Sequence, residues 1–224
     1  MILLKCYYIL CINYSMFKDR IHAGKLLAEK LVNDVNGKNS IVLAIPRGGV
    51  IIGSEVSKRI DAELDIIVSK KITPPNSSEF AIGSIVHDGT IYLEPNWKIY
   101  SNDEQIAKEI EIKTQEVQRR LLQYRAKLNY NFDAEKTVII VDDGIATGCT
   151  VQVILKWLSK YNVRDIILAV PVMPAVTYEI FKKLIKSVVV LEIPTSFSSV
   201  GQFYDTFDQV SDEKVIQVLH ARRF

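Results

Sequence analysis

The sequence predicts a three-layer α/β protein, in which a largely parallel sheet has helices on both faces. Two observations lead to this prediction. Short, continuous apolar runs rich in β-branched residues alternate with longer segments whose apolar residues recur every three or four positions. Within residues 41–68, a strand, a tight turn, a helix and a second strand also follow one another in the manner of a βαβ unit.

The predicted elements of the sheet domain follow in order along the chain. Strands are expected where apolar runs are long enough to be buried on both faces of a sheet, over residues 41–45, 64–68, 137–141, 166–170 and 188–193. Helices are expected over residues 17–35, 50–60, 148–160, 176–185 and 212–221. Asn36-Gly37 ends the first helix, because both residues tolerate a left-handed cap.

Residues 73–130 are predicted to form an insertion into this domain. Pro74 and Pro75 exclude regular structure at its start, and residues 80–86 and 90–93 flank Asp88-Gly89, a two-residue hairpin signal. A long helix from Asp103 to Leu128 follows, with Asp103 as its expected cap. This helix either packs on its own domain or docks a second subunit, in which case the chain is a homodimer.

The composition limits the classes of function. A formal net charge of +2, with no long run of one sign, gives no concentrated basic face, so no DNA partner is expected. The chain has three cysteines, Cys6, Cys11 and Cys149, and this small, odd number does not suit a disulfide framework. It fits a reducing cytoplasm. The apolar residues 1–15 form an N-terminal extension that is shorter than the roughly 20 residues needed to span a bilayer. We expect an added edge strand there, or a natural start near Met16, with residues 16–224 as the functional domain and no membrane role.

The strongest functional signal is Asp142-Asp143, followed by a loop of small residues. The two carboxylates end a buried strand at the edge where open α/β sheets bind ligands. The loop then enters a helix, whose first N–H groups are unpaired and suit a phosphate. Ribose hydroxyls can donate to the carboxylates, so a ribose 5-phosphate satisfies both halves. The alternative is a plain strand-to-helix turn capped by Asp and Thr side chains.

This stretch resembles the signature of type I phosphoribosyltransferases, which bind 5-phosphoribosyl-1-pyrophosphate (PRPP) through such a loop. The resemblance implies that Asp142 and Asp143 contact the ribose hydroxyls, while the loop that follows binds the 5-phosphate. The loop residues so implied are Gly144, Ile145, Ala146, Thr147, Gly148, Cys149 and Thr150. Cys149 has no base near it in sequence and is interpreted as a small tolerated side chain rather than a nucleophile.

Pro46-Arg47-Gly48-Gly49 follows the first strand, where this family has its pyrophosphate-binding loop. Glycines let N–H groups converge on an anion and Arg47 supplies a fixed charge, although the same residues could form a mere turn. Lys70-Lys71 is expected to end the next strand at the same edge, where one lysine would neutralise departing pyrophosphate; the alternative is two solvated lysines. The predicted pyrophosphate-binding residues are Arg47, Gly48, Gly49 and Lys71, and the predicted catalytic residues are Asp142, Asp143, Arg47, Lys70 and Lys71.

The resemblance covers nearly everything from Phe17 onward and indicates a subgroup of predicted phosphoribosyltransferases whose acceptor is undefined. It rests on the segments AIPRGGV, KKITPPNSSEFAIG, VDDGIATG, AVPV and FSSVGQFYDTF, in that order. That subgroup tends to have Arg-Lys where this chain has Lys70-Lys71. A lysine lacks the planar fork that contacts a phosphate through two hydrogen bonds.

Type I enzymes complete their site with a hood that holds the acceptor. Residues 195–210 and 171–174 are the candidates here. The side chains that could stack on a planar base, or else plug the core beneath a loop, are Met173, Phe197, Phe203, Tyr204 and Phe207. His22, His87 and His220 have no metal-ligand spacing, so no metal site in the protein is predicted, and Mg²⁺ is expected to arrive bound to PRPP.

The implied reaction moves the 5-phosphoribosyl group from PRPP to a nitrogen acceptor such as a nucleobase and releases pyrophosphate. The chain would then be a pentosyltransferase of nucleotide and nucleoside metabolism. Purine, pyrimidine and other nitrogen acceptors differ in a few hood contacts that no motif here fixes. One alternative is a non-catalytic, PRPP-binding regulator with the same fold. Another is a partner subunit that docks through the long helix from Asp103.

Overall fold

The computed structural model describes residues 16–35, 37–74, 81–132 and 135–221. Its main sheet has five strands, all parallel, in the order β2-β1-β6-β7-β8. These strands are β1 (Ser40–Ala44), β2 (Glu63–Ile66), β6 (Thr137–Val141), β7 (Asp165–Val172) and β8 (Ser187–Glu192). The predicted α/β class and largely parallel sheet are therefore confirmed.

The two central strands are apolar runs buried on both faces. Every residue of β1 is buried, and in β6 only Thr137, at the start, is partly exposed. The strands pair in register from Ser40 opposite Thr137 to Ala44 opposite Val141, so both end at the same sheet edge. The segments that leave this edge are the two glycine-containing turns of the sequence. Parallel pairing therefore brings Gly48 and Gly49 close to Asp142 and Asp143.

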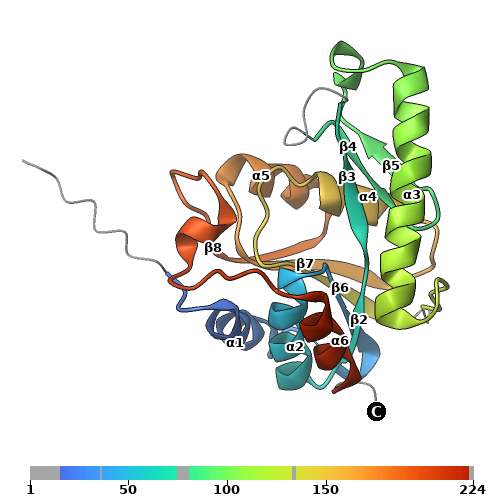
Figure 1. The fold of residues 1–224 in the computed structure, drawn as a ribbon. Coiled ribbons are helices and arrows are strands. Elements are labelled where there is room, and N and C mark those ends of the chain that lie inside the picture. The colour runs from blue at the N-terminus through green and yellow to red at the C-terminus, as the bar shows by residue number, and fades with distance from the viewer. Residues whose placement is uncertain (1–15, 36, 75–80, 133–134, 222–224) are drawn as a thin grey trace, which may run out of the picture.

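Helices cover both faces of the main sheet, as Figure 1 shows. Helices α1, α2 and α6 lie on one side, while α4 and α5 lie on the other. Their bounds are α1 (Arg20–Leu31), α2 (Gly48–Ile60), α4 (Cys149–Leu158), α5 (Ala175–Leu184) and α6 (Asp212–His220). No helix among the described residues is both long enough and apolar enough to cross a membrane.

The first helix is shorter than predicted at both ends, and it ends at Leu31 rather than at Val35. Apolar periodicity places its start at Phe17, but the chain becomes helical only at Arg20, after an N-cap at Asp19. The residues just before the helix pair instead with the C-terminal region. Phe17 N–H donates to the carbonyl of Phe203 at 2.9 Å, and Asp205 N–H donates to the carbonyl of Phe17 at 2.8 Å. Long-range pairing therefore overrides the local helical pattern.

A second sheet, antiparallel and of three strands, stands apart from the first in the order β3-β4-β5. Its strands are β3 (Ser69–Ile72), β4 (Gly83–Val86) and β5 (Ile91–Leu93). The hairpin predicted at Asp88-Gly89 is confirmed, with Gly89 at φ 80°; Phe80, in its predicted first strand, lies outside the described residues. Lys70 and Lys71 were expected to end a strand of the main sheet, and this prediction is wrong. Both residues lie within β3, because the chain leaves the main sheet after Ile66.

The long helix α3 (Asp103–Arg125) runs beside this second sheet (Figure 1). The prediction that Asp103 caps it is wrong. Asn102 is the N-cap, accepting from Gln105 N–H at 2.9 Å while the Gln105 side chain accepts from Asn102 N–H at 3.2 Å. This capping box satisfies two N–H groups at the helix start. α3 packs against β3, β4 and α6, so it has contacts within its own chain.

An aromatic cluster lies between β4, the segment after α3, and α4. The ring of Trp157, which is fully buried, meets Tyr130, Phe132 and His87 with centroids 4.7, 5.7 and 5.7 Å away. His87 is 6% exposed, and its Nδ1 has no hydrogen-bond partner among the described residues. Burial lowers the pKa of His87. The negative charge of Asp88 opposes this shift, and the positive charges of Arg125 and Lys160 add to it.

We expect His87 to make the fold sensitive to acid. The unfolded chain binds a proton near pH 6.5, whereas folded His87 binds one only at lower pH, so stability falls as pH drops through this window by up to about 1.4 kcal/mol per pH unit. Urea unfolding at pH 5.5 and 7.5 measures the loss. The His87→Gln variant should lose less stability than the wild type between these pH values. An equal loss in both proteins would contradict the assignment.

Candidate active site

Two adjacent carboxylates, those of Asp142 and Asp143, follow the carboxyl end of β6. Asp143 N–H donates to Asp142 Oδ1 at 2.8 Å, and Arg20 Nε donates to Asp143 Oδ2 at 2.8 Å. Burial raises the pKa of Asp142, and the adjacent Asp143 adds to the rise. Burial also raises the pKa of Asp143, which the Arg20 guanidinium opposes. The pair is therefore a poorly solvated acidic site with one cation already in place.

The loop of residues 144–150, which we call the anion loop, then turns into α4. None of its backbone N–H groups from Ala146 to Thr150 donates to another described residue. Gly148, at φ 84°, is the N-cap of α4, and a Cβ there would lie 2.7 Å from the Phe181 ring. Free N–H groups at a helix start, next to the positive end of the helix dipole, are suited to binding an anion.

Neighbouring elements hold the anion loop in shape. Thr177 of α5 donates its hydroxyl to the Ala146 carbonyl at 2.6 Å, and Ser84 of β4 donates to the Cys149 carbonyl at 2.5 Å. The Cys149 thiol donates to Glu94 Oε1 at 2.9 Å. Burial and this contact raise the pKa of Cys149 to about 11, so the thiol stays protonated at neutral pH. The expectation that Cys149 is no nucleophile agrees with this environment.

The turn after β1 comes close to the acidic pair. A Cβ on Gly48 would lie 1.8 Å from Asp143 Oδ2, and one on Gly49 would lie 2.8 Å from the Val141 carbonyl. Only glycine therefore fits at these positions without a shift of the neighbours. The peptide bond between Pro46 and Arg47 is cis. Arg47 Nη1 lies 3.6 Å from Asp212 Oδ1 at the start of α6.

An open cleft of about 760 Å³ runs from the turn after β1 to the acidic pair and meets the anion loop at Thr150. Among the described residues, six cationic side chains and two carboxylates line it. The cations are Arg20, Arg47, Lys70, Lys71, Lys113 and Arg120, and the carboxylates are Asp142 and Asp143. Lys70 pairs with Glu116 of α3 at 2.8 Å. Within the described parts of the chain, Lys71 and Arg120 make no ion pair and are available to an anion.

The predicted hood is only partly supported. Met173 is fully buried, since β7 continues through Pro171 and Val172 instead of ending in a loop. Tyr204 is 5% exposed and donates its hydroxyl to the Asp143 carbonyl at 2.6 Å. Both residues are therefore core supports rather than acceptor contacts.

The other three aromatics of the hood are partly buried. Phe197 and Phe203 pack on each other, with centroids 5.6 Å apart, and neither lines the cleft. Phe207 does line it, and its ring lies under the Arg20 guanidinium at 3.8 Å. Of the predicted hood aromatics, Phe207 is therefore the one positioned to touch a ligand in this cleft.

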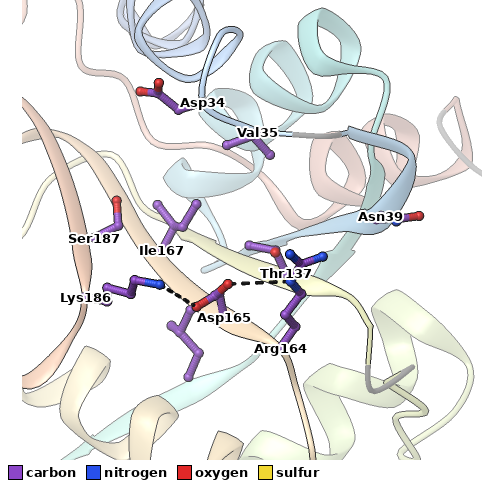
Figure 2. Close-up of a pocket in the computed structure, with 10 residues that line it drawn as sticks. Asp34, Val35, Asn39, Thr137, Arg164, Asp165, Ile167, Lys186 and Ser187 are labelled. Atoms are coloured by element: carbon purple, nitrogen blue, oxygen red, sulfur yellow. Dashed lines mark ion pairs between the residues drawn. The ribbon is translucent and has the colours of Figure 1, made fainter.

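A second cavity, of about 410 Å³, lies at the opposite edge of the main sheet, where β6, β7 and β8 begin (Figure 2). Its two cations, Arg164 and Lys186, both lie beside Asp165, at 3.8 and 3.7 Å. Asp34 completes a balanced set of charges. None of the predicted site residues lines this cavity, and its charge does not favour an anion over a cation.

Several residues of the cleft had no signal in the sequence. Arg20 and Asp143 are 123 positions apart in the sequence. Lys113 and Arg120 belong to a helix that was predicted from its apolar residues alone, so its charged residues were not assigned to the site. Asp212 was predicted as the start of the last helix and not as a partner of Arg47. Pairing of strands and helices distant in sequence brings these residues together, and a single sequence does not reveal such contacts.

The fold is that of an α/β protein with a cleft lined mainly by cations at the carboxyl edge of its parallel sheet. Residues 13–207 match the family model described as the phosphoribosyl transferase domain, and the chain belongs to this family. The resemblance inferred from the sequence is thereby confirmed.

Two relatives illustrate the match. A Mycobacterium tuberculosis protein that bears the provisional name phosphoribosyl transferase is 34% identical over 207 residues, which is 92% of this chain and 46% of that protein. The chain thus spans about half the length of the curated relatives it matches. The solved structure of TT1426 from Thermus thermophilus has a TM-score of 0.77 and 33% identity, over 92% of this chain and 98% of that one.

Proposed function

We propose that this chain transfers the 5-phosphoribosyl group of PRPP to a nitrogen acceptor such as a nucleobase, with release of pyrophosphate. The observation that carries the proposal is the pairing of two features at one sheet edge: the anion loop with unpaired N–H groups, and the carboxylates of Asp142 and Asp143 beside it. A phosphate suits the first and a sugar diol suits the second. A ribose 5-phosphate group presents both within one ligand.

The cations of the cleft support the proposal, because they suit an anionic leaving group. With the 5-phosphate on the anion loop, the pyrophosphate of PRPP would extend toward Arg47, Lys71 and Arg120, which line the same cleft. The bond from C1′ to the pyrophosphate oxygen breaks, positive charge develops on the ribose ring, and the acceptor nitrogen bonds to C1′. Cations stabilise the departing oxygens, and the acidic pair holds the ring.

The donor set agrees with a magnesium ion that comes with its substrate. Mg²⁺ prefers six oxygen ligands and usually binds through one or two carboxylates together with substrate phosphates. Asp142 and Asp143 offer carboxylate oxygens, but Arg20 occupies Oδ2 of Asp143. Most ligands would therefore come from PRPP and water. When bound, the ion would supply positive charge to the pyrophosphate.

A panel assay tests the proposal. The purified protein is incubated with PRPP, Mg²⁺ and single purine or pyrimidine bases, and pyrophosphate release is measured. We expect release that depends on one class of base and stops when PRPP is omitted. Tight PRPP binding without release, across a broad panel of nitrogen acceptors, would contradict turnover and favour a PRPP-sensing regulator.

Arg47→Ala tests the pyrophosphate end of the cleft. We expect pyrophosphate affinity to fall about tenfold, because a charged hydrogen bond is lost, while ribose 5-phosphate affinity changes less than about threefold. Isothermal titration with each ligand measures both values. Arg59→Ala is the matched control, since Arg59 lies at the other end of α2 and pairs with Glu29. Equal losses for the two ligands would rule out this role for Arg47.

A further inference from the structure

Arg20, the first residue of α1, contacts both the acidic pair and the segment of Phe207 and Asp208. Its Nε donates to Asp143 Oδ2 at 2.8 Å, and its Nη1 donates to the carbonyl of Asp208 at 2.8 Å. Its guanidinium carbon also lies 3.8 Å from the centre of the Phe207 ring. The Arg20 side chain is only 12% exposed, and its hydrogen bond to Asp143 is partly buried, whereas its bond to the Asp208 carbonyl is exposed. One residue thus connects the acidic pair to the segment that contains Phe207 and Asp208.

The turn after β1 packs against the same ion pair. A Cβ on Gly48 would lie 2.7 Å from Arg20 Nε, as well as 1.8 Å from Asp143 Oδ2. The absence of a side chain at Gly48 therefore leaves room for the Arg20–Asp143 pair. Both partners are confined by their surroundings, which fixes the direction of the Asp143 carboxylate.

The backbone around Arg20 is joined to the hood segment, residues 203–208. Thr206 N–H donates to the Lys18 carbonyl at 2.9 Å, next to the two bonds that Phe17 makes with Phe203 and Asp205. Tyr204, in the same segment, donates its hydroxyl to the Asp143 carbonyl at 2.6 Å. The hood segment is therefore tied to Asp143 by two routes, one through Tyr204 and one through Arg20.

We propose that Arg20 is a positioning residue, which holds the Asp143 carboxylate in the orientation that receives the ribose hydroxyls and couples ribose binding to the hood segment. This inference rests on the proposed function, because it assigns Arg20 a role at the same ribose site. Arg20 acts through Asp143 and does not itself need to touch the reacting atoms. With Oδ2 held by Arg20, Oδ1 is the oxygen left for a sugar hydroxyl. A movement of Phe207 or Asp208 would shift the Arg20 side chain and, through it, the Asp143 carboxylate.

Ribose 5-phosphate and pyrophosphate are the probes for the test. Isothermal titration compares wild type, Arg20→Gln, Arg20→Lys and the control Lys25→Gln, which changes an exposed basic residue on the same helix. We expect Arg20→Gln to weaken ribose 5-phosphate about tenfold, because the charged partner of Asp143 is lost, and pyrophosphate by less than about threefold. Arg20→Lys should recover part of the loss, because it keeps the charge but not the second donor. A role in folding alone would not separate the two ligands in this way.

Phe207→Leu tests the coupling by removing the ring beneath the Arg20 guanidinium while both charges of the Arg20–Asp143 pair remain. It should weaken ribose 5-phosphate in the wild-type background but add little in the Arg20→Gln background, because both changes break the same connection. Fully additive losses would overturn the coupling. Unchanged ribose 5-phosphate affinity in Arg20→Gln would overturn the positioning role while leaving the proposed function intact. A wild-type protein that binds neither PRPP nor ribose 5-phosphate would instead overturn the proposed function, and this inference with it.

Discussion

Replacing Asp143 by Asn should lower kcat/KM for PRPP by about 10- to 100-fold, since a neutral amide makes weaker hydrogen bonds to hydroxyls and does not offset positive charge on the ribose ring. The fold should remain intact. Burial raises the pKa of Asp143, which means that the folded protein disfavours its charged form, and Asn removes that cost. Arg20 loses its counter-charge but keeps its contacts with Asp208 and Phe207.

Steady-state kinetics and thermal unfolding check the Asp143→Asn prediction together. Asp61→Asn is the matched control, because Asp61 is exposed and sits in a left-handed cap that Asn also tolerates. The control should keep wild-type kinetics and stability. Unchanged kinetics in Asp143→Asn would show that Asp143 has no role in catalysis. A large fall in the unfolding temperature would show that the variant loses activity because it misfolds.

Gly48→Ala should cost about 100-fold in kcat/KM, the scale expected when an active-site group is displaced by about 1 Å. The added methyl would overlap Asp143 Oδ2 at 1.8 Å, so the carboxylate has to rotate away from Arg20. Backbone conformation is not the cause, since Gly48 does not have a left-handed φ. We expect ribose 5-phosphate and pyrophosphate to be weakened alike, because Gly48 belongs to the proposed pyrophosphate loop and also lies against Asp143 of the proposed ribose site.

Gly89→Ala is the control for the glycine substitution. Gly89 has a left-handed φ of 80° but open space around it, so alanine there should cost stability of about 1 kcal/mol and leave the kinetics unchanged. Titration of both ligands and kinetics of both variants are the measurements. Wild-type activity in Gly48→Ala would mean that the close approach between Gly48 and Asp143 does not matter for catalysis.

The sheet and the two loops at its edge could be predicted because their signals are local. The apolar run of residues 137–141 matches β6, and the acidic pair and Gly148 follow it directly in sequence. The start of the first helix could not be predicted, because Phe17 pairs with Phe203, 186 positions later (203 − 17). Lys70 and Lys71 were placed at the right cleft but on the wrong sheet, since sequence periodicity does not distinguish the end of one strand from a short strand beginning three residues later.

The hood prediction failed in part for a different reason. Aromatic side chains serve equally as stacking surfaces and as core residues, and only their neighbours decide between these roles. Tyr204 is surrounded by Phe17, Phe207 and the Asp143 carbonyl, so it supports the site from within. Arg20, which contacts Asp143 and Phe207, could not have been selected from among the 28 lysines and arginines of the chain.

A crystal structure with ribose 5-phosphate bound tests the central claim most directly, because that ligand has the two groups the site is proposed to bind. We expect phosphate oxygens within hydrogen-bonding distance of the N–H groups from Ala146 to Thr150, and the 2′- and 3′-hydroxyls facing Asp142 and Asp143. A phosphate bound elsewhere in the cleft, with the anion loop empty, would contradict it.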